Sequence, residues 1–503
     1  MSFTSVSVFL IATVLSLLLY LVHRIFNHWK SRGWPHDPPH WFFGNLQGIG
    51  KTKHFLHVYR ELYAKYKGIS PVCGLYFFFQ PVAFITDLDL AQRILVKDFS
   101  NFADRGIFSN ESGDPLSAHL FALDGLKWRN LRNKLSSAFT SGKMKKMFPI
   151  VIEVADRFCD VYKKLLENES VIEIKDLNAR YTTDVIGTCA FGIDCNSLAD
   201  PNADFRRYCG QFFTDRRHNP MVEGLILSFP KLAERLNVKF TPQPVSDFFL
   251  KAVDDTVAYR EDNKVIRNDF MSMLIDLKNH STFDESGTEA PGITMGQLAA
   301  QAFVFFVAGF ETSSTTMGFC LYELSLNPEI QKTLRAEILS ILKETGGELT
   351  YDSLNRMSYL EKVLMETLRK YSILQDLIRI AQKDYKVPGT NFVLEKGSRV
   401  MIPTDAIHYD PDIYPDPQKF DPERFDPEEI KKRHPMAWLP FGEGPRNCIG
   451  LRFGKMQTKI GLITLLRNFE FSKCEKTAIP IEIDKGNFLV GSKGGIYLKV
   501  KKL

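Results

Sequence analysis

The sequence of 503 residues lacks paired cysteines, internal repeats and a flexible linker. Its eight cysteines are spread along the chain without a CxxC pair or a compact even framework, which favours a reducing compartment over secretion. No Ser-, Gly- or Pro-rich stretch divides the chain after about residue 50, and no repeat indicates a solenoid. The formal net charge of +5 is small for this length, so electrostatics gives no support for a nucleic-acid partner. We therefore expect one large globular domain.

The first stretch of the chain is long and apolar. It runs from Phe3 to Val22, about the length at which a single helix spans a bilayer. A cleaved signal peptide would need a basic start and a small-residue cleavage site, and neither is present. We predict a retained membrane anchor over residues 1–22. Positive charge on its C-terminal side indicates that this end stays in the cytosol, and the basic residues concerned are His23, Arg24, His28, Lys30 and Arg32.

The segment behind the anchor combines positive charge with proline and tryptophan, and we predict a basic, Pro/Trp-rich linker over residues 23–45. The tryptophans suit the membrane interface, and the prolines would stiffen the connection to a folded domain over residues 46–503. These residues are Trp29, Trp34, Trp41, Pro35, Pro38 and Pro39.

Helical periodicity dominates the rest of the sequence. A β-hairpin is expected from residues 76–79 and 82–85, which flank Gln80 and Pro81. Thr294 and Gln297 form a capping box that opens a long apolar helix ending at Leu326. We predict a mainly α fold with small β-sheets. The other predicted helices span residues 88–96, 127–138, 150–167, 177–191, 244–265, 269–278 and 360–371, and a hydrophilic loop is expected over 279–291.

The strongest functional signal is the segment from Phe441 to Gly450, a glycine-rich loop that holds one cysteine ahead of an amphipathic helix. The glycines permit turns with positive φ and close approach of the backbone to a flat cofactor. Cys448 lies where the free N–H groups and positive dipole end of the next helix favour an anion, so we expect a depressed thiol pKa and a thiolate ligand. Arg446 adds a cation that can pair with a carboxylate. The alternative is a small buried cysteine in a capping turn.

A polar interruption lies inside the long apolar helix. Ala308 and Gly309 form a small pair that lets a flat ring lie against the backbone. Thr312 is one helical turn beyond Ala308, and Glu311 beside it supplies an acid. A hydroxyl and a carboxyl are unfavourable in an apolar helix unless they are paired, and a local kink is the alternative outcome. We interpret the pair as a relay that passes protons on through water.

Two further segments predict a charged network. Glu366 and Arg369 share one helix face, where a surface pair would contribute only about 0.2–0.5 kcal/mol. Arg424, in a proline-bounded segment, is placed to complete a network with them. A desolvated and fully paired network would fix the chain that leads to the cysteine loop. Loss of one member would then cost about 3–5 kcal/mol.

With these motifs the chain resembles the cytochrome P450 superfamily, whose signature is Phe-x-x-Gly-x-Arg-x-Cys-x-Gly. The resemblance covers the chain from the anchor almost to its end, and it is greatest for the insect microsomal members of family six. It implies the P450 fold in a single large catalytic domain, with Cys448 as the axial ligand of haem b. Glu311 and Thr312 would be the acid–alcohol pair. Family six is indicated by the segments 102–106, 139–144 and 182–188, and the family's ExxR and PERF network by Glu366, Arg369 and Arg424.

The same resemblance implies which side chains hold the haem. Trp128 and Arg132 have the WxxxR spacing of the family's helix C, whose Trp and Arg contact a propionate. Surface charge for Arg132 and Arg379, and core packing for Trp128, are the competing interpretations. The expected cofactor-binding residues are Cys448, Arg446, Trp128, Arg132, Arg379, Phe441, Ala308 and Gly309.

Electrons must come from a partner, because no glycine-rich dinucleotide fingerprint follows a strand and no flavin motif is visible. The resemblance implies NADPH-cytochrome P450 reductase, with cytochrome b5 as a further partner, at the endoplasmic reticulum membrane with the catalytic domain in the cytosol. A basic face around the cysteine side would suit an acidic flavoprotein. Its expected members are Lys134, Lys143, Lys145, Lys146, Lys431, Lys432, Arg433 and Lys455.

The expected activity is insertion of one oxygen atom of O₂ into a lipophilic organic substrate. Forty phenylalanines suggest an aromatic pocket, with Phe303, Phe305, Phe306 and Phe310 around the relay. The resemblance points to xenobiotics such as insecticides and plant toxins, or to insect hormones, as for an ecdysteroid hydroxylase. Two rival activities are a haem-thiolate isomerase or dehydratase, which the intact acid–alcohol pair disfavours, and a non-enzymatic haem sensor.

Overall fold

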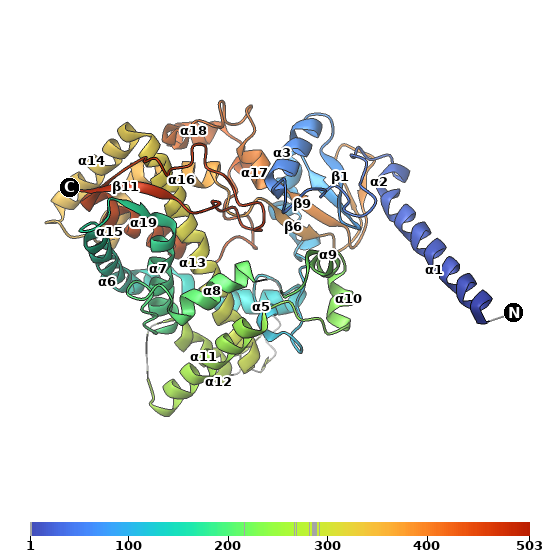
Figure 1. The fold of residues 1–503 in the computed structure, drawn as a ribbon, viewed down its shortest axis with the longest axis horizontal. Helices are drawn as coiled ribbons and strands as arrows, with labels where there is room; N and C mark the ends of the chain where they lie inside the picture. Colours follow the sequence, from blue (N-terminus) through green and yellow to red (C-terminus); the bar gives the residue numbers. More distant parts are fainter. Residues whose placement is uncertain are drawn as a thin grey trace.

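The structure is a computed structural model that describes residues 3–215, 217–265, 267, 269–280, 282–283, 289–290 and 292–503. Helices make up most of the body, a four-stranded sheet lies at the end nearer the N-terminus, and α1 (Phe3–Phe26) projects away from both (Figure 1). The predicted mainly α fold with small sheets is confirmed.

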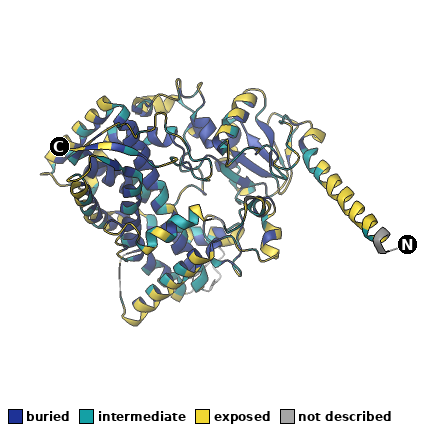
Figure 2. Cartoon of the chain, in the orientation of Figure 1, coloured by how far each residue is buried: buried dark blue, intermediate teal, exposed yellow. Residues whose placement is uncertain are grey.

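The projecting helix α1 is the candidate membrane anchor. Its span Val6–Phe26 has a mean hydropathy of 2.3 and none of its most apolar window is buried, as the exposed colouring in Figure 2 shows. The helix continues beyond Val22, where the sequence predicted its end, because His23 and Arg24 extend the last turn. The helix Met295–Leu326 is also long and apolar enough to span a membrane, but 67% of its window is buried, as in a core helix.

The segment after α1 packs on the sheet. Trp29 is 2% exposed, its indole N–H donates to the carbonyl of Leu75 at 3.2 Å, and its ring stacks on Trp34 with centroids 4.6 Å apart. A Cβ on Gly74 would overlap the indole of Trp29, so glycine makes room for this contact. The membrane-interface position predicted for Trp29 and Trp34 is therefore wrong, because the two rings bury apolar surface of the domain. Trp41 is 70% exposed.

The four-stranded sheet has the order β1-β2-β9-β6 and holds the predicted hairpin. β1 and β2 pair antiparallel, β2 and β9 parallel, and β9 and β6 antiparallel. The hairpin turn lies at Phe78 and Phe79 instead of the expected Gln80 and Pro81, because Phe78 takes a φ of 52° that suits a two-residue turn. The strands are β1 (Val72–Phe77), β2 (Gln80–Ile85), β6 (Leu377–Ile380) and β9 (Arg399–Ile402).

The smaller sheets tie distant parts of the chain together. One has the order β10-β11-β3, and two further pairs are β4-β5 and β7-β8. Most of the predicted loop over residues 279–291 lies outside the described residues. The strands are β3 (Val171–Glu173), β4 (Thr282–Phe283), β5 (Glu289–Ala290), β7 (Tyr385–Lys386), β8 (Val393–Leu394), β10 (Phe469–Ser472) and β11 (Tyr497–Lys502).

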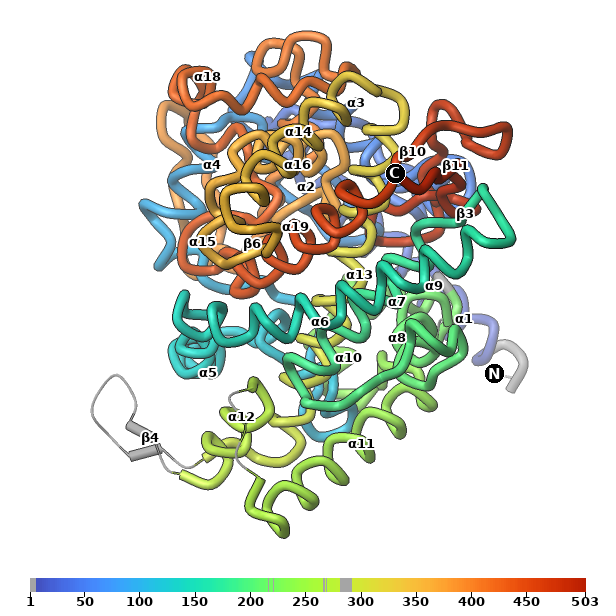
Figure 3. Tube along the Cα trace, turned by 90° about the vertical axis from the view of Figure 1, so that its left-hand side faces the viewer, coloured from blue at the N-terminus to red at the C-terminus, as the bar shows by residue number. Residues whose placement is uncertain are grey.

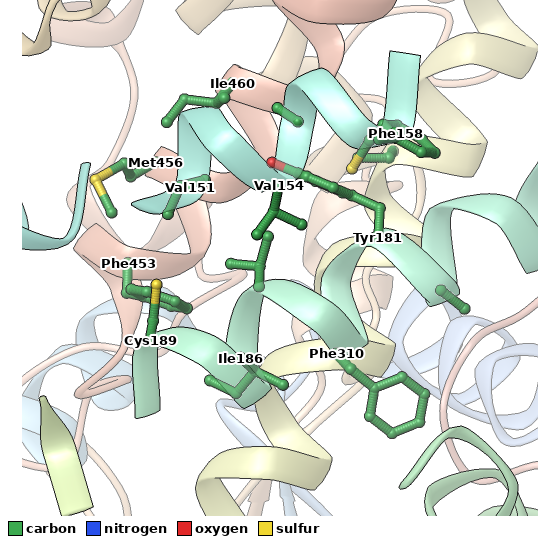
Figure 4. Close-up of a cluster of buried hydrophobic side chains, with 14 of the residues drawn as sticks. Val151, Val154, Phe158, Tyr181, Ile186, Cys189, Phe310, Phe453, Met456 and Ile460 are labelled. Carbon is green, nitrogen blue, oxygen red and sulfur yellow. The ribbon is translucent and has the colours of Figure 1, made fainter. Parts of the chain in front are cut away.

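The long helix α13 (Met295–Leu326) runs through the middle of the body (Figures 1 and 3). Its N-terminus has the predicted capping box, in which Thr294 Oγ1 accepts from the N–H of Gln297 and Gln297 Oε1 accepts from the N–H of Thr294. α7 (Ile174–Ile186), α19 (Leu451–Asn468) and α16 (Ser358–Lys370) pack against it. Side chains of α6, α7 and α19 gather in the core, as Figure 4 shows for Phe158, Tyr181, Ile186 and Met456, and Phe310 of α13 belongs to the same core cluster.

The other predicted helices are present, with shifted ends. The largest difference is α6, which begins at Ser141 instead of the expected residue 150, and the helix passes through Pro149. The remaining helices are α2 (His28–Ser31), α3 (Phe55–Tyr66), α4 (Leu88–Gln92), α5 (Gly125–Ser136), α6 (Ser141–Leu165), α8 (Asp204–Thr214), α9 (Pro220–Ser228), α10 (Pro230–Arg235), α11 (Gln243–Asp262), α12 (Phe270–Asn279), α14 (Pro328–Glu344), α15 (Tyr351–Arg356), α17 (Thr404–His408) and α18 (Pro427–Lys432).

Candidate functional site

The loop before α19 holds Cys448 through its own backbone. The N–H of Cys448 donates to the carbonyl of Phe441 at 2.8 Å, and the N–H of Asn447 donates to the carbonyl of Gly444 at 3.0 Å. Gly444 has a φ of 74°, and a Cβ there would overlap the carbonyl oxygen of Leu95. Only glycine therefore fits this position, where the loop approaches the distant residue Leu95.

Cys448 is exposed, whereas most of the other cysteines are buried. The expected depression of its thiol pKa is wrong for the protein alone. Desolvation by the surrounding protein raises the pKa of Cys448, and this outweighs the N–H of Gly450 and the charges of Arg132 and Arg105, which lower it. Coordination to a metal deprotonates a thiol outright, so the side chain is still suited to bind a metal as thiolate.

Arg446 is buried beside the cysteine loop. Its Nε donates to the carbonyl of Ala103 at 2.6 Å, and one terminal nitrogen donates to the carbonyl of Leu123 at 2.8 Å. The guanidinium lies 4.0 Å from the ring centroid of Trp128, which is itself buried. The second terminal nitrogen, Nη1, has no hydrogen-bond partner among the described residues.

Arg132 and Trp128 both lie on α5, but they contact different residues of the cysteine loop. Arg132 donates to the backbone carbonyl of Asn447 at 3.0 Å and to its side-chain oxygen at 2.8 Å. Arg132 therefore holds the residue next to Cys448, whereas Trp128 packs against Arg446. Neither surface charge for Arg132 nor core packing alone for Trp128 describes these contacts.

Two further arginines complete a cationic cluster. Arg379, on β6, is buried, and its Nε has no partner in the described part of the chain. Arg105 donates to the carbonyls of Arg446, at 3.1 Å, and of Phe121, at 2.9 Å. Sequence reasoning missed Arg105, although it lies in the segment 102–106 that carried part of the resemblance.

The lowered pKa values of these arginines indicate that nearby carboxylates do not balance the positive charge of the cluster. Burial and the charge of Arg446 lower the pKa of Arg379 to about 9, and burial with the charges of Arg379 and Arg446 lowers the pKa of Arg105. Asp104 and Asp124 offset only part of the positive charge around Arg446. Unpaired nitrogens on two buried arginines beside an exposed cysteine fit an anionic group with carboxylates and a metal, which is the donor set that haem requires.

On α13, Ala308 and Thr312 lie one turn apart, with Ala308 exposed, and the hydroxyl of Thr312 donates to the carbonyl of Ala308 at 2.8 Å. Gly309 does not share this face. A Cβ on Gly309 would lie 2.8 Å from Cδ1 of Ile186 in α7, so this glycine serves the close packing of two helices (Figure 4 shows Ile186). Packing against α7 therefore explains why residue 309 has no side chain, and contact of its backbone with a flat cofactor stays a prediction.

The carboxylate of Glu311 also lies toward α7. It forms an ion pair with Lys175 at 2.7 Å and accepts from the hydroxyl of Thr315 at 3.3 Å. Both members of the ion pair are partly buried. No hydrogen bond joins the side chains of Glu311 and Thr312 in this described stretch of α13. Sequence reasoning missed Lys175, because its partner is far away in the chain.

The structure brings together the three residues of the predicted charged network. Arg369 and Glu366 are fully buried and form two hydrogen bonds, of 2.6 and 2.8 Å. Arg424 lies at ion-pair distance from Glu366, 3.5 Å, but its Nε makes no hydrogen bond to a described residue. Glu366 also accepts a hydrogen bond from the N–H of Asp421 at 2.9 Å, so α16 is joined to the segment that contains Asp421 and Arg424.

A buried histidine continues this network toward the cysteine loop. Arg369 donates to the carbonyl of His408 at 3.0 Å. The imidazole of His408 accepts from the N–H of Leu439 at 2.8 Å and contacts the hydroxyl of Ser372 at 2.7 Å. Burial and the charges of nearby arginines lower the pKa of His408 to about 3, so it stays neutral and can accept this bond. Leu439 in turn accepts from the N–H of Gly442 in the loop.

The phenylalanines near the relay lie in the core. Phe303, Phe306 and Phe310 are buried, and their rings contact phenylalanines of α8 and α11. Phe305 packs on Phe270 of α12, with ring centroids 4.1 Å apart. These contacts stabilise the packing of α13, so they do not by themselves define a pocket.

Three of the predicted basic residues are already paired. Lys431, Lys432 and Lys455 form ion pairs with Glu428, Glu429 and Glu361. By contrast, Lys143, Lys145 and Lys146 form no ion pair with a described residue and stand in the first turns of α6. This group is the part of the predicted basic face with the most available charge.

Comparisons with known proteins agree with this geometry. The sequence model of the family described as Cytochrome P450 matches residues 35–499. The chain is 50% identical to "Probable cytochrome P450 6a14" of Drosophila melanogaster, covering 98% of this chain and 99% of the relative. It is also 50% identical to "Cytochrome P450 6a8", covering 97% of each chain, and to "Cytochrome P450 6a2", covering 99% and 100%, both from the same fly.

Proposed function

Because this chain belongs to the cytochrome P450 family, as a haem monooxygenase similar to family-six enzymes of Drosophila, we propose that it oxidises lipophilic xenobiotics at the endoplasmic reticulum membrane. The observation that carries the site assignment is the exposed Cys448 beside a cluster of buried arginines with unpaired nitrogens. The family takes haem b as cofactor and draws electrons from NADPH through a reductase.

We assign Cys448 as the ligand of the haem iron. Thiolate-ligated haem supplies the oxygen chemistry, since the sulfur pushes electron density onto iron and favours cleavage of the oxygen–oxygen bond. The protein's part is to fix the sulfur in place. The bond from the N–H of Cys448 to Phe441 and the bonds from Arg132 to Asn447 hold the cysteine and the residue before it.

The arginine cluster is assigned to the propionates. Arg379 and Arg446 supply buried guanidinium groups with nitrogens that have no partner in the described part of the chain, and Arg105 and Arg132 add positive charge beside them. Charge-assisted hydrogen bonds from arginine to carboxylate are roughly twice as strong as neutral ones. Binding of the propionates would also relieve the mutual repulsion that lowers the pKa of Arg105 and Arg379.

Thr312 and Glu311 are assigned to proton delivery. The hydroxyl of Thr312 can hold a water molecule near the exposed Ala308 face, while Glu311 is held at the α7 side by Lys175. A proton that reaches Glu311 from solvent must therefore pass through water to Thr312, because the two side chains are not bonded directly.

Membrane association follows from α1 and from an apolar surface close to its end. Phe26 stacks on Phe79 of the hairpin turn with centroids 5.9 Å apart, and a Cβ on Gly224 of α9 would lie 2.9 Å from Phe78. We propose that this surface rests in the cytosolic face of the endoplasmic reticulum membrane, where lipophilic substrates collect. Its exposed apolar side chains are Trp41, Met221, Leu225, Phe229, Leu232 and Leu236.

The redox partner is proposed to be NADPH-cytochrome P450 reductase, with cytochrome b5 as an additional donor. Lys143, Lys145 and Lys146, which form no ion pair within the described part of the chain, lie near α5, whose Arg132 contacts the cysteine loop. Reversing the three lysines to Glu is expected to lower reductase-supported turnover while peroxide-supported turnover stays the same. Reversal of Lys499, Lys501 and Lys502 on β11 serves as the matched control. Equal loss in both assays would reject this face as the contact.

The experiment that tests the function uses purified full-length protein, reductase and NADPH in phospholipid vesicles. Insecticides and plant toxins are compared with ecdysteroid precursors for spectral shifts on binding and for products that contain one added oxygen atom. The proposal expects NADPH-dependent oxygenation of several xenobiotics. Selective turnover of an ecdysteroid precursor alone would favour hormone synthesis, and a product formed without NADPH would favour an isomerase or dehydratase.

A further inference from the structure

Three consecutive backbone carbonyl groups of α13 each accept a hydrogen bond from a side chain. Thr312 donates to the carbonyl of Ala308, as described above. Gln457 Nε2 donates to the carbonyl of Gly309 at 2.7 Å, and the hydroxyl of Thr182 lies 2.9 Å from the carbonyl of Phe310. The turn that carries Glu311 and Thr312 is thus held by hydrogen bonds from both α19 and α7.

Gln457 makes the more complete of the two contacts between helices. Its second amide hydrogen goes to the hydroxyl oxygen of Ser313 at 2.6 Å, so both donors are used on α13. Its backbone carbonyl accepts from the hydroxyl of Tyr181 in α7 at 3.0 Å. The hydroxyl of Thr182, by contrast, has a single proton and also lies 3.0 Å from the carbonyl of Asn178 in its own helix.

Packing alone does not account for a glutamine at this position. Gln457 is fully buried, and its oxygen Oε1 has no hydrogen-bond partner among the described residues. Leucine or methionine would fill similar space without burying an unpaired polar oxygen, which is unfavourable. The gain that offsets this burial is the pair of bonds from Nε2 to α13.

The position of Gln457 along α19 links two parts of the site. The helix begins at Leu451, directly after the loop that holds Cys448, and Gln457 lies within its first two turns. The helix α19 therefore follows the cysteine loop directly and is also hydrogen-bonded to α13 at Gly309 and Ser313. The close approach of the same two helices continues at Gly461, where a Cβ would lie about 2.5 Å from Cε of Met317.

We propose that Gln457 is a positioning residue that sets the turn from Ala308 to Thr312 relative to Cys448. The proposal rests on the function assigned above to Cys448 and Thr312. Loss of the amide donor would free the carbonyl of Gly309 and let the turn shift. A shift of about 1 Å in a positioned group is enough to lower the rate of a reaction many-fold.

The test compares Gln457→Met, which keeps length and apolar volume but removes the donors, with Thr458→Val. Thr458 is the buried neighbour on α19, and its hydroxyl makes no hydrogen bond to α13 among the described residues. Hydrogen–deuterium exchange followed by mass spectrometry reports on peptides that cover residues 308–316. Product formed per NADPH consumed reports on coupling. The carbon monoxide spectrum of the reduced protein reports on haem ligation.

For Gln457→Met we expect exchange in this peptide to rise about fivefold, as loss of one net hydrogen bond predicts. Product per NADPH should fall about tenfold, while the thiolate-type spectrum is kept. Thr458→Val should leave all three unchanged. Unaltered exchange and coupling in Gln457→Met would overturn the proposal.

A second variant covers the case in which Gln457→Met does not fold. Ser313→Ala removes one acceptor from the α13 side, and it should raise exchange and lower coupling by a smaller factor because the bond to Gly309 stays. No change in this variant, with Gln457→Met unfolded, would assign Gln457 to folding and reject the positioning role. Failure of the proposed function itself is distinguishable, because the wild-type protein would then lack the thiolate-type spectrum.

Discussion

The cysteine loop and the relay turn of α13 reach their shapes by different routes. The loop is closed by bonds between neighbours in the sequence, such as that from the N–H of Cys448 to Phe441, and the distant residues Leu95 and Arg132 then pack against it. The relay turn is a regular stretch of helix whose side chains are placed by residues far away in the chain, Lys175, Ile186 and Gln457. A local motif therefore specifies the turn of the loop, which the fold then holds in place, whereas the fold alone places the side chains of the relay turn.

The largest effect is expected at the loop's cysteine. Cys448→Ala should abolish NADPH-dependent oxygenation, because no other side chain in the loop can supply a thiolate to iron. Turnover with reductase is the measurement, and Cys474→Ala, a partly exposed cysteine outside the site, is the control. NADPH-dependent oxygenation by Cys448→Ala would show that the cysteine loop does not supply the ligand of the catalytic iron.

Gly444→Ala tests how much the close approach of the loop to Leu95 matters for stability. The substitution forces a φ of 74° on alanine and places its Cβ against the Leu95 carbonyl oxygen, so the free energy of unfolding should fall by about 3 kcal/mol. Gly494→Ala is the matched control, since Gly494 has a φ of 76° but nothing within 4 Å of its Cβ position. It should lose only about 1 kcal/mol. If urea denaturation shows the same loss of unfolding free energy in both variants, the contact between residue 444 and Leu95 does not explain the need for glycine.

At the relay turn, Thr312→Ala should leave haem binding intact and lower product per NADPH by about tenfold, with hydrogen peroxide released instead. The reason is loss of the hydroxyl that holds water beside Ala308. Thr312→Ser keeps a hydroxyl and should retain most of the coupling. Full coupling in the alanine variant would contradict the relay.

The smallest effect is expected at Lys175→Met, which releases Glu311 from its ion pair. Because exposed and partly exposed pairs are worth about 0.2–1 kcal/mol, a change of that size in the barrier should lower the turnover rate by about 1.4- to fivefold. Lys163→Met, which breaks the surface pair with Asp160, is the control and should have no effect. A Lys175→Met protein with unaltered turnover would mean that the partner from α7 is not part of proton delivery.

The sequence was informative where one short segment carries both the residues and their geometry. The cysteine loop, the capping box of α13 and the pairing of Glu366 with Arg369 were all predicted from spacing or resemblance, and the structure brings these residues together. Helix ends were predicted less well, as at α6, which begins at Ser141 and passes through Pro149 instead of starting at residue 150.

Contacts between distant helices could not be predicted in this way. The packing role of Gly309 was missed, because nothing near it in sequence reveals that Ile186 approaches from α7. Trp29 and Trp34 were placed at the membrane because their composition suits an interface, whereas the sheet that covers them is formed by residues from 72 onward. Arg105, Lys175 and Gln457 gave no signal of their own for the same reason.

The central claim is that the sulfur of Cys448 holds the haem iron. The most direct measurement is the absorption spectrum of the reduced protein under carbon monoxide, recorded for the wild type and for Cys448→His. The account predicts the band characteristic of thiolate-ligated haem in the wild type and its replacement by the band of an imidazole-ligated haem in the variant. A thiolate-type band in Cys448→His, or nitrogen ligation in the wild type, would contradict it.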